Sequence, residues 1–162
     1  MLTATDHISK YVTYGEAIHS DTAERLGILN VPDANQLANM QYVASTVFDK
    51  VRDHFGVPII VSSFFRSPEL NSKTPGASLT SQHMKGEAID HLLPGRNAEI
   101  FKWVKDNVGI INFDQMIWEY GTSSEPAWVH ISRVSYRPNR HQILRYYTNA
   151  QGQIVGIPFD LF

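Results

Sequence analysis

Two histidines and an aspartate are the residues of this sequence whose types and spacing best suit chemistry. His83 and Asp90 lie in the segment S-Q-H-M-K-G-E-A-I-D, and His130 lies in the apolar segment W-V-H-I-S. Two imidazoles and one carboxylate are a ligand set of catalytic zinc sites, which keep the fourth coordination position open for water. Closed structural sites usually take four ligands, often cysteines, and this chain has no cysteine. The pattern therefore predicts one catalytic zinc ion bound by these three residues.

The composition limits the other classes of protein to which the chain can belong. Its 162 residues are enough for one domain with a sizeable core. A formal net charge of -2 gives no basic surface for nonspecific nucleic-acid binding, so we expect no such partner. The absence of cysteine excludes disulfides and thiolate metal sites. We expect a single domain over residues 1–162, with residues 1–34 as an N-terminal helical extension and residues 35–162 as the core.

The N-terminal segment has neither a basic start nor an apolar run of signal-peptide length, and no other segment has membrane-spanning length. We therefore expect a protein that is made in the cytoplasm and has no membrane partner. We also expect it to be a monomer.

Helices are predicted where a capping residue precedes apolar residues spaced three or four positions apart. The strongest pattern covers residues 35–55 and ends at Gly56, which is typical of a helix C-terminus. Shorter helical segments are expected after Thr13, Ser20 and Ser67 and over residues 97–108.

Strands are predicted at residues 59–65, 88–91, 113–120 and 127–133, with a closing hairpin formed by 142–147 and 154–157. The first of these is expected to be buried. Together with the helices, they indicate an α+β fold.

The alternation of side chains along a strand tests the proposed metal site. Val129 and Ile131 are expected to face the core, which places His130 on the opposite face together with Asp90 of the neighbouring segment. His83 comes from a loop that Gly86 allows to turn sharply. A histidine between valine and isoleucine is also typical of a packed core residue with a satisfied hydrogen bond, so the pattern around His130 fits both interpretations.

Four segments of the chain carry a family resemblance. F-R-S-P-E-L-N, S-Q-H-M-K-G-E-A-I-D, F-D-Q-M-I-W-E and W-V-H-I-S resemble the zinc D-alanyl-D-alanine carboxypeptidases of peptidase family M15, in the branch rich in phage-encoded members. The resemblance extends from Tyr14 to about Tyr136. It implies that His83, Asp90 and His130 hold the zinc. It also implies the α+β fold shared with the hedgehog signalling domain, in which a small antiparallel sheet carries the zinc site and helices flank it.

Hydrolysis at such a centre also requires a general base. Glu119 is the first choice, because Gln115, Ile117 and Glu119 lie on one face of their predicted strand. Many members of the family have an acidic residue three positions before the last histidine ligand, whereas this chain has Ala127 there. Glu125 is the alternative base. The competing interpretation of Glu119 is a buried carboxylate that holds a histidine or the backbone in place. The competing interpretation of Glu125 is an ordinary solvated charge in a loop.

Several residues around the predicted metal site are candidates for substrate binding. Arg66 follows an apolar strand, where its guanidinium can bind a substrate carboxylate or an oxyanion, as the matching arginine of the family is thought to do. An ordinary surface ion pair, or a clamp on local backbone carbonyls, is the alternative for Arg66. Ser81 and Gln82 flank His83, although Ser81 equally suits a turn cap. Gln115 and Trp128 are the remaining candidates.

Three functions of different classes fit these observations. The first is a zinc peptidase that cuts peptidoglycan peptides, as a D-Ala-D-Ala carboxypeptidase or an endopeptidase. Its expected setting is a phage endolysin that reaches the cell wall or periplasm after release, with a bacterial wall-remodelling or tail-associated enzyme as the alternative. The second is a zinc-binding module without catalysis, which Ala127 favours. The third is a structural protein without a metal. Iron or another divalent ion also fits the ligand set.

Overall fold

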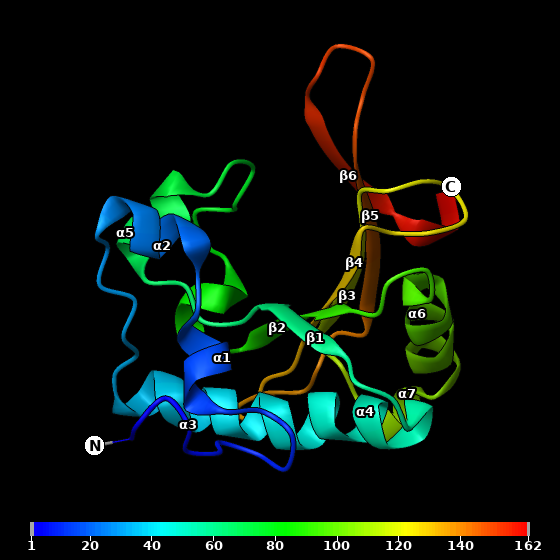
Figure 1. The fold of residues 1–162 in the computed structure, drawn as a ribbon. Coiled ribbons are helices and arrows are strands. Elements are labelled where there is room, and N and C mark those ends of the chain that lie inside the picture. The colour runs from blue at the N-terminus through cyan, green and yellow to red at the C-terminus, as the bar shows by residue number, and fades with distance from the viewer. Residues whose placement is uncertain (1, 162) are drawn as a thin grey trace.

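The computed structural model describes residues 2–161 and has a single α+β domain built on one six-stranded sheet (Figure 1). The order across the sheet is β1-β2-β4-β3-β5-β6. The strands are β1 (Ile60–Ser63), β2 (Ala88–Leu92), β3 (Gln115–Glu119), β4 (Trp128–Ser132), β5 (Gln142–Thr148) and β6 (Ile154–Pro158). Neighbouring strands are antiparallel except for β3 and β5, which are parallel. The α+β prediction is confirmed, and the sheet is mixed rather than purely antiparallel.

The helices begin where the sequence places capping residues. Thr13 and Glu16 form a capping box, and the side chains of Ser20 and Ser67 each accept a hydrogen bond from the backbone at a helix start, as predicted. The α-helices are α1 (Tyr14–Ile18), α2 (Asp21–Leu26), α3 (Ala34–Val43), α4 (Asp49–Phe55), α5 (Pro68–Lys73), α6 (Asn97–Asp106) and α7 (Val108–Ile111). Short 3₁₀ turns are formed by Gln82–Lys85 and Phe159–Leu161.

The helix predicted over residues 35–55 is confirmed, but it is not a uniform α-helix. A π-helical segment, Ala44–Phe48, joins α3 to α4. Within this region Ser45 and Thr46 donate side-chain hydrogen bonds to the carbonyls of Gln41 and Tyr42, 2.7 and 2.6 Å away. Such bonds compete with the regular helical pattern and favour local widening. Apolar spacing of three or four residues does not reveal this widening, because the same residues still face the sheet.

Two other sequence predictions need correction. The buried strand expected at residues 59–65 is shorter, and Ile60 in β1 is 51% exposed because β1 forms an edge of the sheet. Its pairing with β2 is irregular between Val61 and Ser63, which is common at sheet edges. The helix expected over residues 97–108 ends at Asp106, and the short helix α7 follows Asn107.

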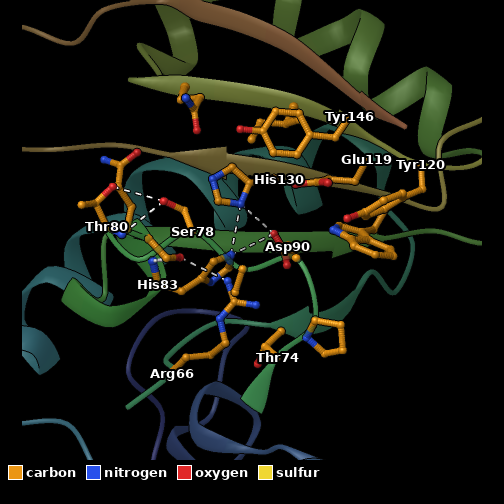
Figure 2. A pocket seen from close by; sticks show the side chains of 18 of the residues that line it. Arg66, Thr74, Ser78, Thr80, His83, Asp90, Glu119, Tyr120, His130 and Tyr146 are labelled. Atoms are coloured by element: carbon orange, nitrogen blue, oxygen red, sulfur yellow. Dashed lines mark hydrogen bonds and ion pairs between the residues drawn. The ribbon is translucent and has the colours of Figure 1, made fainter. Parts of the chain in front are cut away.

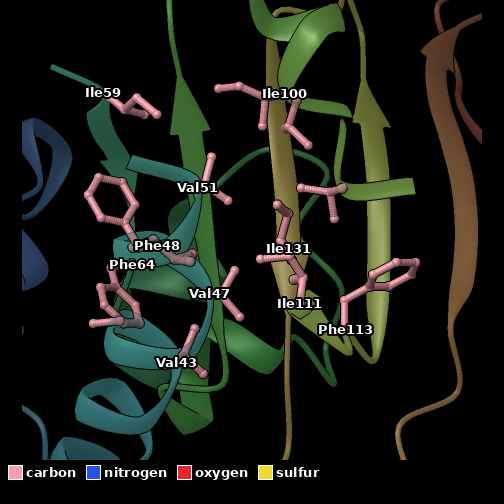
Figure 3. Close-up of a cluster of buried hydrophobic side chains, with 14 of the residues drawn as sticks. Val43, Val47, Phe48, Val51, Ile59, Phe64, Ile100, Ile111, Phe113 and Ile131 are labelled. Atoms are coloured by element: carbon pink, nitrogen blue, oxygen red, sulfur yellow. The ribbon is translucent and has the colours of Figure 1, made fainter. Parts of the chain in front are cut away.

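One face of the sheet forms the hydrophobic core (Figure 3). Val129 and Ile131 of β4 are fully buried together with Val47 of the π-helical segment and Val51 of α4. Because side chains alternate along a strand, the residues between them point to the opposite face. That face is available for a site.

The β5–β6 hairpin extends the sheet at its other edge and projects from the body of the molecule (Figure 1). The hairpin predicted for residues 142–157 is confirmed. Among the described residues, no helix combines the length and apolar character needed to cross a membrane.

A glycine substitution tests how closely the turn that carries His83 packs against α3. Gly86 has a φ of +69°, and a Cβ atom there would lie 2.5 Å from the Gln36 carbonyl oxygen and 2.7 Å from Met40 Cγ. Gly95 has a φ of +73°, but a Cβ atom there meets nothing within 4 Å. We expect Gly95→Ala to lower the free energy of unfolding by about 1 kcal/mol through backbone strain alone, and Gly86→Ala by about 3 kcal/mol because a clash is added. Urea unfolding measures both, and equal losses would contradict this packing.

Candidate active site

A cleft of about 340 Å³ lies on the sheet face opposite the core (Figure 2). Its floor is formed by side chains of β2, β3, β4 and β5, and residues 74–80 form part of its wall. His83, Asp90 and His130 lie near its centre, with Glu119 and Tyr120 on one side and Ser78 and Thr80 on the other. The predicted metal ligands therefore converge in an open cavity.

Strand pairing and one turn bring the three ligands together. Asp90 of β2 lies directly opposite His130 of β4 in the antiparallel register, and His83 comes from the 3₁₀ turn before β2. The distances are 3.1 Å from His83 Nε2 to His130 Nδ1, 3.0 Å from His130 Nδ1 to Asp90 Oδ1, and 3.3 Å from His83 Nε2 to Asp90 Oδ1. All three side chains are buried.

This donor set fits a zinc ion. Ligand atoms bound at about 2.0–2.1 Å in a tetrahedron lie about 3.3 Å from one another, close to the separations found here. His83 Nδ1 lies 2.6 Å from the carbonyl oxygen of Phe64, which only accepts hydrogen bonds. Nδ1 must therefore carry the proton, which leaves the Nε2 lone pair directed at the other two ligand atoms.

The electrostatics of the ligands favour the protonation states that a metal requires. Burial lowers the pKa of His83, because it disfavours the charged imidazolium. Burial alone would raise the pKa of Asp90, but the adjacent imidazoles of His83 and His130 outweigh it and hold that pKa well below its ordinary value. An ionised carboxylate beside a neutral imidazole is ready to bind a divalent ion.

A second group of potential ligands has a different setting. His19, Asp21 and Glu24 also bring ligand atoms within 4.8 Å of one another, but all three are exposed around α2. Exposed charged groups of this kind commonly form ion pairs without a metal. His91 lies on the core face of β2, where its ring packs 5.1 Å from that of Phe48.

Glu119 lies where the sequence predicts a base. It is on the site face of β3, 8% exposed, and lines the cleft beside the ligands. Burial raises its pKa to about 7, which the charge of His130 partly opposes and that of Asp90 reinforces. Its neighbours act on it through charge rather than through hydrogen bonds. A carboxyl group that exchanges its proton near neutral pH is suited to general base catalysis.

Glu125 is not brought to the cleft. Its carboxylate accepts hydrogen bonds from the backbone N–H groups of Asn97 and Ala98, at 2.7 and 3.2 Å. These unpaired N–H groups at the start of α6 attract a carboxylate. Glu125 is therefore neither a candidate base nor a freely solvated loop charge.

Arg66 lines the cleft below the metal ligands, as predicted (Figure 2). Its Nη2 donates to Ser81 Oγ at 3.2 Å, and its buried Nε has no hydrogen-bond partner among residues 2–161. Burial lowers the pKa of Arg66, and the charges of Asp90 and Glu119 oppose that effect. A surface ion pair, one alternative interpretation of Arg66, is not what the structure contains.

The remaining predicted binding residues all line the cleft. Ser81 also caps the 3₁₀ turn by accepting the backbone N–H of His83, so both interpretations of it hold. Gln82 is held by Asp114, and Gln115 donates to Gln142 at 2.7 Å. Trp128 packs against Tyr120 with ring centroids 5.4 Å apart.

The residues of the cleft that sequence reasoning missed include Arg140 and Tyr146. Tyr146 is placed beside Glu119 by the parallel pairing of β5 with β3. The hairpin pattern predicted β5 but not its neighbour in the sheet, so no local signal connected these residues to the site.

Comparison with known proteins agrees with this geometry. The sequence profile of a family described as Peptidase M15 matches residues 10–132. The matched region contains the three ligands, Glu119 and Arg66, whereas β5 and β6 lie beyond it. A search of curated proteins found no match. Because the profile covers well over half of the chain, the protein belongs to peptidase family M15.

Proposed function

We propose that this protein is a zinc-dependent peptidase that hydrolyses peptide bonds of bacterial peptidoglycan. The observation that carries the proposal is the buried group of His83, Asp90 and His130, which faces an open cleft beside Glu119. Membership of family M15 supports peptide hydrolysis. The resemblance to the phage-rich branch favours a carboxypeptidase or endopeptidase of the endolysin type that acts at the cell wall.

The residues of the cleft divide the chemistry among them. A zinc ion held by the three ligands would lower the pKa of a water molecule and polarise the scissile carbonyl. Glu119 takes the proton of the attacking water and passes it to the leaving amine. Arg66 places its positive charge near the oxygen on which negative charge develops.

A zinc-binding module without catalysis is the second candidate, because Ala127 occupies the position where many family members have an acidic residue. The location of Glu119 weighs against it, since a carboxylate with a raised pKa reaches the site from β3 instead.

Mass spectrometry of fragments released from purified peptidoglycan tests this function directly. We expect the zinc-loaded protein to produce new amine and carboxyl ends, and a chelator to prevent their appearance. The masses then identify the bond that is cut. If fully zinc-loaded protein releases no fragments from several types of cell wall, the zinc-binding module without catalysis is the better interpretation.

Metal content tests the ligand assignment. We expect His130→Ala to lose at least 100-fold in zinc affinity, because only two ligands remain. His19→Ala, in the exposed group around α2, should bind one zinc ion as the unchanged protein does. Elemental analysis and competition with a chromophoric chelator measure both variants, and undiminished binding by His130→Ala would refute the assignment.

Turnover tests the role of Glu119. Glu119→Gln keeps the shape of the side chain but cannot take a proton, so we expect bound zinc with a kcat lower by about 10²–10⁴-fold. Glu125→Gln is the matched control, because it changes a carboxylate that contacts α6 rather than the cleft. Full activity of Glu119→Gln would place the base elsewhere.

Stability as a function of pH tests the environment of Glu119 independently of catalysis. The ordinary pKa of a glutamate is 4.5, and burial raises that of Glu119 to about 7. Between these values the native state keeps a proton that the unfolded state has lost, so the contribution of Glu119 to stability falls as pH rises. Relative to the unchanged metal-free protein, we expect Glu119→Gln to gain up to about 3 kcal/mol between pH 4.5 and pH 8. Urea unfolding at both pH values measures this gain, and a pH-independent difference between the two proteins contradicts the burial argument.

A further inference from the structure

Arg140 contributes a positive charge to the cleft from outside the region matched by the family profile. The match ends at residue 132, whereas Arg140 lies in the segment that joins β4 to β5. It nevertheless lines the same cavity as the metal ligands. This positive charge therefore comes from a part of the chain that the family profile does not match.

Asp114, just before β3, holds this arginine in place. Its carboxylate is fully buried and accepts hydrogen bonds from Arg140 Nε at 3.1 Å, Arg140 Nη2 at 2.7 Å and the Arg140 backbone N–H at 3.0 Å. Arg137 binds the same carboxylate through two nitrogens, at 2.6 and 3.0 Å. Burial alone would raise the pKa of Asp114, but the two arginines outweigh it and hold that pKa well below its ordinary value.

Two guanidinium groups share the carboxylate of Asp114, and Glu87 lies nearby, because Gln82 Nε2 donates to both carboxylates. Arg137 directs its Nη1 to the Pro138 carbonyl as well as to Asp114. Arg140 uses Nε and Nη2 for Asp114, and its Nη1 makes no hydrogen bond to another residue within 2–161. The Arg140 side chain is 48% exposed and lines the cleft. A guanidinium with an uncommitted donor binds carboxylates well.

The segment that carries Arg140 is fixed before any substrate binds. Asn139 exchanges two hydrogen bonds with the backbone of Val134, at 3.0 and 3.2 Å. The Gln142 backbone N–H donates to the Asp114 carbonyl at 3.0 Å and begins β5. Because the guanidinium is already oriented, little conformational entropy is lost when it binds a ligand.

The same cluster is connected to the metal centre. Gln82 Nε2 donates to Asp114 Oδ2 at 3.2 Å, and Gln82 immediately precedes the ligand His83. In the sheet, Gln115 follows Asp114, while Ile117 lies opposite the ligand His130.

We propose that Arg140 determines substrate specificity by binding a carboxylate of the substrate peptide away from the scissile bond. This inference rests on the proposed peptidase function and adds an anionic peptide as the substrate class. The other arginine of the cleft, Arg66, lies near the negative charges of Asp90 and Glu119, so Arg140 is better placed to bind an anionic group away from the metal.

Two synthetic stem peptides of identical sequence test the proposal, one with its internal carboxylates free and one with them amidated. With zinc-loaded protein we expect a kcat/KM at least tenfold higher for the free acid, mainly through a lower KM. Arg140→Gln should abolish this preference, and Arg140→Lys should restore part of it. Arg137→Gln is the matched control, because it removes a partner of Asp114 that does not line the cleft, and it should keep the preference.

A binding measurement separates this inference from the peptidase function. Calorimetric titration measures the binding of both peptides to zinc-loaded Glu119→Gln, which should prefer the free acid by the same factor of about ten. The double variant that also carries Arg140→Gln should lose this preference. Hydrolysis of both peptides at equal rates, or a preference that survives in Arg140→Gln, overturns the role of Arg140 and leaves the peptidase intact. Selective binding that depends on Arg140, without hydrolysis by the unchanged protein, supports Arg140 and overturns the peptidase. If the protein shows neither selective binding nor hydrolysis, both the role of Arg140 and the peptidase function are overturned.

Discussion

The register between β2 and β4 is the constraint on which the site depends. It places Asp90 directly opposite His130, and in the same pairing it places Ile89 opposite Ile131. A slip of one residue in either strand would send a charged or polar ligand into the core and an isoleucine into the cleft. The energy of the hydrophobic core therefore fixes the geometry of the metal centre. His83 needs a separate support, which the turn at Gly86 supplies by packing against α3.

The buried charges of the cleft oppose folding unless they are compensated. Asp90 and Asp114 are each stabilised by neighbouring nitrogen donors, so burial leaves them ionised. Among residues 2–161 no nitrogen donor binds the Glu119 carboxylate, and burial instead raises its pKa to about 7. The three carboxylates thus differ because of their partners rather than their depth. Asp90 and Asp114 therefore suit fixed structural roles, whereas Glu119 suits proton transfer.

The local sequence predicted those parts of the site that depend on local order. Alternation in W-V-H-I-S gave the correct face for His130, and capping residues marked the start of α1, α2 and α5. Predictions that depended on distant partners were less successful. Burial of β1 failed because that strand is a sheet edge, and the local sequence did not show that the start of α6, far along the chain, binds Glu125. The local pattern did not contain these contacts.

The parallel pairing of β5 with β3 extends the cleft beyond the region that the family profile matches. Within the matched region, β2, β3 and β4 already hold the ligands and Glu119. The chain then returns through a rigid segment and adds β5 beside β3, which brings Tyr146 next to Glu119. A new strand at the edge of an existing sheet need not disturb the register inside it. In the function that we propose, the three ligands hold the metal, and the outer wall of the cleft, including Arg140, sets which peptides fit.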